Sequence, residues 1–156
     1  MKNDYIAEEL KKIFESKEFK APLDSAMACA WIIAHFKGVN LKVLDLRNVS
    51  AFTDFFVIGS ASNPTQGRAM AGAILTYLKP HHNQVISSEG MNSADWILLD
   101  YGDIVIHIFE ESLRDIYDLD GLWLKNPRIP IPESYYTHVS DASFEVSKIP
   151  SEEDYF

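Results

Sequence analysis

The chain has 156 residues, of which 47% are hydrophobic and 12% aromatic, and its 14 Lys and Arg face 23 Asp and Glu for a net charge of −9. This size and apolar content predict one folded domain and exclude a disordered chain. The negative charge opposes attraction to phosphate backbones, so we expect no direct binding to DNA. An acidic protein can still dock on a basic protein, because complementary charge guides the encounter.

The sequence also indicates where the protein works. It has no run of 18 apolar residues, and its first 20 residues carry charges throughout, so we expect neither a membrane segment nor a signal peptide. Its single cysteine, Cys29, lies in an apolar run and cannot form an intrachain disulfide. A packed thiol and a cytoplasmic location are therefore the expectation.

Two helices are predicted at the N-terminal end. Residues 4–16 place Ile6, Leu10, Ile13 and Phe14 at helical spacing between charges, which predicts an amphipathic helix. After a break at Pro22, residues 25–38 predict a second helix that is apolar on most of its circumference and therefore buried. We expect Gly38 to cap its end.

The middle of the chain predicts strands alternating with helices. Branched and aromatic residues predict strands, and Pro64 suits the first turn of a helix. Gly102 is the expected tip of a hairpin. The predicted strands are 41–46, 55–61, 84–88, 96–100 and 103–109, and the predicted helices are 64–79 and 112–123.

The C-terminal segment differs in composition. Residues 126–156 contain three closely spaced prolines at their start and carry two basic against six acidic side chains, which predicts an extended tail. We therefore divide the chain into an N-terminal helical extension (1–22), a main domain (23–125) and a Pro-rich acidic tail (126–156). The hypothesis for the tail is that it folds back on the domain or extends a contact with a basic partner surface.

The familiar catalytic signatures are missing from the sequence. The motifs GxxxxGK[ST], GxGxxG and GxSxG do not occur, and neither do HxxxH, HExxH or CxxC. We therefore expect no cofactor and no metal.

A metal-dependent nucleotidyltransferase is the alternative worth testing. Gly59 and Ser60 match the Gly-Ser pair that such enzymes carry at a strand end. The acidic pair that should follow is missing, since residues 70–88 hold no carboxylate, and Asp100 and Asp103 flank a turn at the wrong spacing. Two carboxylates converge on a metal readily when they lie two apart on one strand, which these do not.

The segment from Leu41 to Trp123 resembles the ribosomal silencing factor (Iojap) family. The matching stretches are 43–71, Glu89 with Gly90, and DWILLDYGDIVIHIFEESLRDIYDLDGLW at 95–123. The most specific residues, in family order, are Trp96, Asp100, Tyr101, Gly102, Asp103, His107, Phe109, Arg114, Tyr117, Leu119, Leu122 and Trp123.

The resemblance implies an α/β fold with a mixed sheet of about five strands and packed helices, related to nucleotidyltransferases but without their activity. It implies a translational repressor that binds the large ribosomal subunit through its protein number fourteen of the universal series. Occupying that site would block joining of the small subunit and lower translation when nutrients are scarce. It also implies possible homodimers, which could use the same surface.

Strand alternation suggests where the partner binds. Along 103–109, Asp103, Val105, His107 and Phe109 share one face, whereas three isoleucines share the other. The first face mixes polar groups with aromatics, as interface centres do. The candidate partner-binding residues are Trp96, Tyr101, Asp103, His107, Phe109, Arg114, Tyr117 and Trp123.

Each of these residues also has a structural interpretation. His107 could be a satisfied core or edge histidine, and Trp96 and Trp123 could fill the core. Arg114 could form a surface pair with Asp115, or be held by Asp103 or a neighbouring carboxylate and so order the binding face. We expect Thr53 and Asp54 to form a turn or cap before the strand at Phe55.

Overall fold

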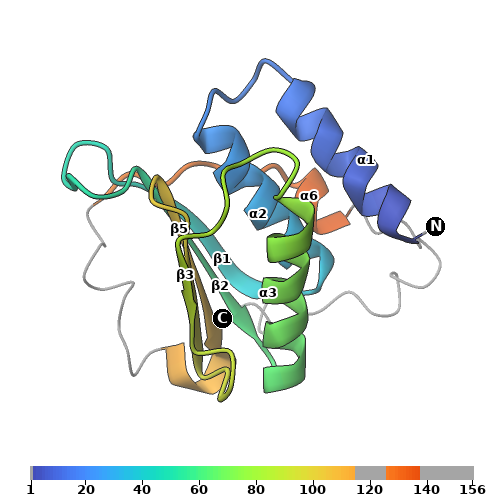
Figure 1. Cartoon of the computed structure of the whole chain (residues 1–156), viewed down its shortest axis with the longest axis vertical. Helices are drawn as coiled ribbons and strands as arrows, with labels where there is room; N and C mark the ends of the chain where they lie inside the picture. Colours follow the sequence, from blue (N-terminus) through green and yellow to red (C-terminus); the bar gives the residue numbers. More distant parts are fainter. Residues whose placement is uncertain (1, 115–125, 138–156) are drawn as a thin grey trace.

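The structure is a computed structural model that describes residues 2–114 and 126–137. Helices α1, α2, α3 and α6 lie on one side of a sheet (Figure 1). The elements in chain order are α1 Lys2–Glu15, α2 Leu23–His35, β1 Val39–Asp45, β2 Phe55–Ala61, α3 Pro64–Tyr77, β3 Ser87–Glu89, β4 Trp96–Asp100, β5 Ile104–Glu110, the 3-10 helix η1 Glu111–Leu113 and α6 Ser134–Thr137.

The sheet has five strands in the order β1-β2-β5-β4-β3. Strands β2 and β5 are parallel, and the other neighbours are antiparallel. The predicted mixed α/β fold with packed helices is therefore confirmed. Among the described helices, none combines the length and apolar character needed to cross a membrane.

The main core lies between the sheet and the helices. Strand β5 contributes Ile104, Ile106 and Ile108, and every residue of α2 from Ser25 to Ala34 is buried, Cys29 included. The apolar side of α1 joins the same core through Ile6, Leu10 and Ile13. The predicted helix over 4–16 is thus present and packs against the domain. The proposed boundaries at 22 and 125 remain predictions.

The first part of the tail folds back on the domain. The backbone N–H of Asp45 donates to Pro127 O at 2.9 Å, and that of Ile129 donates to Val43 O at 2.8 Å, so the segment runs alongside β1. Tyr135 of α6 is buried in the main core, and α6 packs on α2. Residues 138–156 of the predicted tail lie outside the described residues.

The end of α2 differs from the prediction. The helix ends at His35, and the residue with positive φ is Lys37 at 68°, not Gly38. The N–H groups of Lys37 and Gly38 donate to Ala34 O and Ile33 O at 2.9 and 2.8 Å. Gly38 is needed for space instead, because a Cβ there would overlap Ile33 Cγ2 and lie 2.9 Å from Ile33 O.

Two other elements are shifted or incomplete. The strand expected at 84–88 is the three-residue β3, Ser87–Glu89. The first residues of the helix expected at 112–123 belong to the 3-10 helix η1, and the residues from 115 to 123 lie outside the described residues. The remaining strands and α3 occur within two residues of their predicted bounds, and Pro64 begins α3 after the cap Asn63, whose side chain accepts from Gln66 N.

We expect Gly38→Ala to lower the free energy of unfolding by about 1–3 kcal/mol, because the added methyl group overpacks against Ile33. The matched control is Gly72→Ala in α3, where a Cβ meets nothing within 4 Å, so that a gain of roughly 0.5–1 kcal/mol in helix propensity is expected. Urea denaturation of both variants measures the difference, and equal effects would contradict the packing role of Gly38.

Candidate partner-binding face

The sheet face opposite the helices, called the outer face below, follows from strand alternation and register. Each β5 residue on it has a partner in β2 and another in β4, and paired residues point to the same side. Its side chains include the charged residues Lys42 and Asp100 towards the edges of the sheet, and between them Leu44, Phe56, Ile58, Ser60, Trp96, Leu98, Val105, His107 and Phe109.

Part of the outer face is a small second core. Leu44, Ile58 and Phe109 form a buried cluster with Leu46, and half-buried Phe56 and Trp96 pack against it. Phe109 is fully buried, which supports a structural role for this predicted site residue. At least one of the predicted partner-binding residues, Phe109, therefore supports the outer face by packing and is itself inaccessible.

His107 lies within an aromatic cage on this face. Trp96 Nε1 donates to His107 Nδ1 at 3.1 Å, and the Phe56 ring meets the imidazole edge-on at 4.5 Å between centroids. The side chain is 3% exposed, and this burial lowers the pKa of His107 to about 4. The imidazole is therefore neutral at pH 7, with its proton on Nε2 because Nδ1 accepts. Nε2 has no hydrogen-bond partner in the described part of the chain.

Arg114 is a buried cross-link at one end of the sheet. Its Nη1 donates to Asn40 O at 2.5 Å and to Ser60 Oγ at 2.8 Å, and the residue is 3% exposed. Asp103 does not hold Arg114, because Asp103 lies before the start of β5 and Arg114 follows its end. The alternative partner Asp115 lies outside the described residues, so that part stays a prediction. Arg114 instead joins the segment after β5 to β1 and β2.

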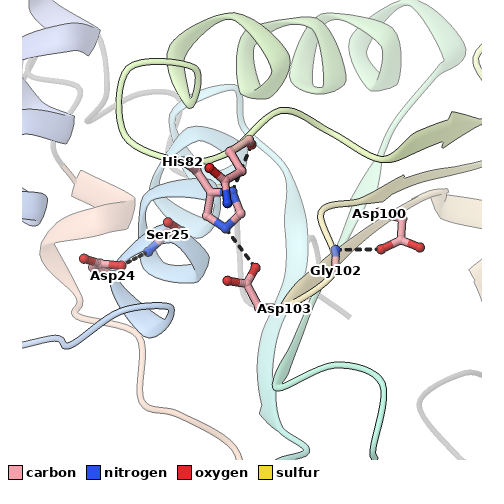
Figure 2. Close-up of polar contacts among 7 residues, drawn as sticks. Asp24, Ser25, His82, Asp100, Gly102 and Asp103 are labelled. Atoms are coloured by element: carbon pink, nitrogen blue, oxygen red, sulfur yellow. Dashed lines mark hydrogen bonds and ion pairs between the residues drawn. The ribbon is translucent and has the colours of Figure 1, made fainter.

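Tyr101 and Asp103 lie at the other end of β5, away from this cage. Tyr101 is buried in the main core, and burial raises the pKa of its phenol. Asp103 Oδ1 contacts His82 Nε2 at 2.8 Å, whereas Asp100 Oδ1 accepts from Gly102 N in the hairpin turn (Figure 2). Asp103 thus does not join Val105 and His107 in one cluster, although alternation predicted a shared face. Two further predicted residues, Tyr117 and Trp123, lie outside the described residues.

The predicted turn before β2 is present. The N–H of Leu46 donates to Asp54 O at 2.8 Å, and the Ser50 hydroxyl accepts from Phe52 N and Thr53 N. The hydroxyl Oγ1 of Thr53 is buried without a hydrogen-bond partner among the described residues, so Ser50 supplies the side-chain bonds that we expected from Thr53.

Two residues of the outer face are absent from the predicted partner-binding set, although strand alternation had already placed one of them, Val105, on this face. Leu98 and Val105 are half-buried and belong to neither apolar cluster, although both point outward beside His107 and Asp100. The signal that could have found them is the cross-strand register, because Leu98 pairs with His107 and Val105 with Phe56. Together with Phe56 and Trp96 they form an apolar area around the caged histidine, and Lys42 and Asp100 lie on the same face.

We looked among the described residues for side chains that could bind a metal ion. Among residues 2–114 and 126–137, no three His, Cys, Asp or Glu side chains come together in a way that could hold a metal ion. Asp100 and Asp103, the carboxylates that a nucleotidyltransferase would need, are engaged with separate partners.

Comparison with known proteins gives consistent matches. A family model described as "Ribosomal silencing factor during starvation" matches residues 19–154. The chain is 34% identical over 87 residues to ribosomal silencing factor RsfS of Haemophilus influenzae, which covers 56% of this chain and 85% of that protein. It is 33% identical over 87 residues to mouse "mitochondrial assembly of ribosomal large subunit protein 1", covering 54% of this chain and 38% of that one.

A crystal structure of a Chromobacterium violaceum protein shares the fold. The two superpose with a TM-score of 0.58 at 25% sequence identity, over 70% of this chain and 95% of the other. The fold and the sequence therefore point to the same relatives.

The buried neutral state of His107 predicts a dependence of stability on pH. Its pKa of about 4 lies below the unfolded value near 6.5, so its contribution is complete above pH 6.5 and is lost as the pH falls toward 4. At about 1.4 kcal/mol per unit this amounts to about 3 kcal/mol. His107→Gln keeps an acceptor for Trp96 but cannot titrate, so its free energy of unfolding should fall less over this range. Parallel pH profiles from urea denaturation would contradict the assignment.

The buried contacts of Arg114 predict a role in the stability of the fold. Arg114→Met leaves Asn40 O and Ser60 Oγ without their cation, and should lower the free energy of unfolding by about 2–3 kcal/mol. Arg47→Met, at an exposed Arg–Asp45 pair, is the matched control and should change little. An unchanged melting temperature for Arg114→Met would show that the contacts do not support the fold.

Proposed function

Because this chain belongs to the ribosomal silencing factor family, we propose that it binds the large ribosomal subunit in the cytoplasm and blocks joining of the small subunit. Its contact on the subunit would be ribosomal protein number fourteen of the universal series. The mechanism is steric exclusion, which requires a binding free energy and no change in any covalent bond. Members of the family are named as ribosomal silencing factors, and the family is not a known enzyme family.

The names of relatives support the choice of subunit. The Haemophilus influenzae relative is named for ribosomal silencing, and the mouse relative for assembly of the large ribosomal subunit. The match covers 87 residues, which are 54% of this chain and 38% of the mouse protein.

The observation that carries the proposal is the composition of the outer face. Phe56, Trp96, Leu98 and Val105 are half-buried apolar side chains on a sheet face that bears none of the described helices (Figure 1). Interface centres are enriched in aromatic residues and depleted in charged ones, and a standard interface buries about 800 Å² per partner. Side chains held on a sheet that is backed by a packed core lose less conformational entropy on binding than side chains on a loop.

The charge of the chain favours a basic partner. A net charge of −9 attracts a positively charged protein surface over distances of about a Debye length and repels exposed nucleic acid. On a ribosome this combination directs the chain to a basic protein and away from exposed RNA. Association should therefore slow as the salt concentration rises.

The direct test is sedimentation of purified ribosomal subunits through a gradient with and without the protein. We expect the protein to migrate with the large subunit and the peak of joined ribosomes to shrink. If the protein stays at the top and joining is unchanged, the proposal fails. Turnover of a nucleoside triphosphate with Mg²⁺ that is lost on changing Asp100 or Asp103 would instead support a nucleotidyltransferase.

A charge placed on the outer face should separate binding from folding. Val105→Lys puts an ammonium group beside Phe56 and should weaken binding to the large subunit at least tenfold, or about 1.4 kcal/mol, while the melting temperature changes little because Val105 belongs to neither core cluster. Val49→Lys makes the same change on an exposed loop, where the valine is 59% exposed, and should bind like the parent. If both variants bind the large subunit equally well, the outer face is not part of the contact.

If the chain also forms homodimers through this face, dimer and ribosome compete for it. Val105→Lys would then shift the oligomer to monomer in analytical ultracentrifugation while also reducing ribosome binding. A dimer that persists in the variant must use another surface.

A further inference from the structure

The turn that joins β3 to β4, residues 90–95, is bound by a side chain of α3. Arg68 Nε donates to the backbone oxygen of Met91 at 2.9 Å, and its Nη2 donates to that of Asn92 at 2.6 Å. The turn lies beside the first turns of α3, and Trp96 follows it as the first residue of β4 (Figure 1). We propose that Arg68 is a positioning residue, which orients Trp96 on the outer face by fixing this turn.

The guanidinium group suits this contact because its donors are fixed in one plane. It presents N–H groups at set angles, so one side chain can bind two consecutive carbonyl oxygens at once. Bonds from a charged donor are shorter and stronger than bonds between neutral groups. The two oxygens lie 23 and 24 positions along the chain from Arg68. Arg68 therefore connects the helix layer to the turn that leads into β4.

The turn depends on support because its backbone conformation is unusual. Ala94 has a φ of 60°, in the left-handed region that residues with a Cβ rarely adopt, and its N–H donates to Gly90 O at 2.8 Å. A residue in this conformation persists when the surrounding structure holds it there. The oxygens that Arg68 binds belong to Met91 and Asn92, inside the turn that this bond closes. The two bonds from Arg68 thus stabilise the turn at its centre.

The turn is in direct contact with the backbone of Trp96. Gly90 has a φ of 82°, and a Cβ there would overlap Trp96 O and lie 3.3 Å from Ile97 Cα. The backbone oxygen of Asp95 accepts from Glu110 N at 3.0 Å, which joins the end of the turn to β5. With the two backbones in contact, a displacement of the turn would move the backbone at Trp96 itself.

The orientation of Trp96 determines part of the outer face. Its Nε1 donates to His107 Nδ1 at 3.1 Å, and its ring packs against Phe109 with 5.0 Å between centroids. Hydrogen bonds weaken steeply as their angles depart from linear, so a small displacement at Trp96 is enough to weaken this one. The inference rests on the proposed function, in which Trp96 belongs to the contact with the large subunit. Arg68 lies on the helix side of the sheet and therefore acts through Trp96.

The test is NMR of the full chain labelled with nitrogen-15, combined with sedimentation of the large subunit. Arg68→Met removes both bonds at an exposed position of α3. We expect the indole N–H of Trp96, assigned by its loss in Trp96→Phe, to shift and to exchange with solvent several-fold faster. The indole N–H of Trp31, in buried α2, should not change. Binding to the large subunit should weaken several-fold, because the binding face loses its supporting contacts.

Two further variants separate the geometry of the contact from its charge. Arg68→Lys keeps the positive charge but replaces the planar group by a point charge, so we expect a smaller change of the Trp96 signal in the same direction. The matched control is Lys11→Met, which removes one cation from α1, where Lys11 Nζ lies 3.9 Å from Glu15. It should leave the Trp96 signal and the binding unchanged.

A Trp96 indole that keeps its shift and exchange rate in Arg68→Met would overturn the proposal. Equal changes at Trp96 and Trp31 would also overturn it, because they would indicate a general loosening of the fold. The proposal fails as well if the Trp96 signal changes while the variant binds as tightly as the parent. If the parent itself does not bind the large subunit, the proposed function fails, whereas the NMR comparison still decides whether Arg68 orients Trp96.

Discussion

The central strand β5 separates the helix-covered core on one side of the sheet from the outer face on the other. The rest of the structure depends on this division of its side chains. Ile104, Ile106 and Ile108 point into the helix-covered core, while Val105, His107 and Phe109 point outward. The parallel partner β2 and the antiparallel partner β4 repeat the same division. A one-residue slip would exchange the two sets of side chains, so the buried isoleucines fix the register and thereby the outer face.

Polar groups on the outer side of the sheet are held by few, specific bonds. The indole N–H of Trp96 donates a hydrogen bond to His107 Nδ1, and Arg114 Nη1 donates to Ser60 Oγ and Asn40 O. Such bonds are strong where water is excluded, and leaving one partner unsatisfied there is costly. The orientation of Trp96, a half-buried aromatic on the candidate interface, is therefore set by a histidine that itself has little contact with solvent.

Much of the fold could be predicted because it follows from local pattern. Alternation along residues 103–109 separated the core face from the outer face, and the Asn63–Pro64 pair marked the start of α3. The role of Gly38 could not be predicted, since a close approach to Ile33 depends on the packing of α2 against its own exit loop. The position of Asp103 was missed because alternation holds only within a strand, and His82 pairs with it from 21 residues away.

The candidate site was predictable only in part, for a related reason. Residue type and order identified Trp96, His107 and Phe109, which the sheet does bring together. Alternation placed Val105 on the outer face but did not mark it as a binding residue, and Leu98 joins that face only through its cross-strand pairing with His107.

The returning tail has a consequence for how this protein can meet other chains. In the segment beside β1, Pro127 O and Ile129 N are used by the strand, so the groups of Arg128 and Pro130 point away from it. Pro130 and Pro132 have no N–H, which leaves a further strand almost no donors to pair with along that border. The opposite border is the three-residue β3, which is too short to recruit a partner strand well. Near Leu44 and at β3 the described edges of the sheet therefore offer little for a further strand to pair with, which favours its broad surface as the place for the proposed contact.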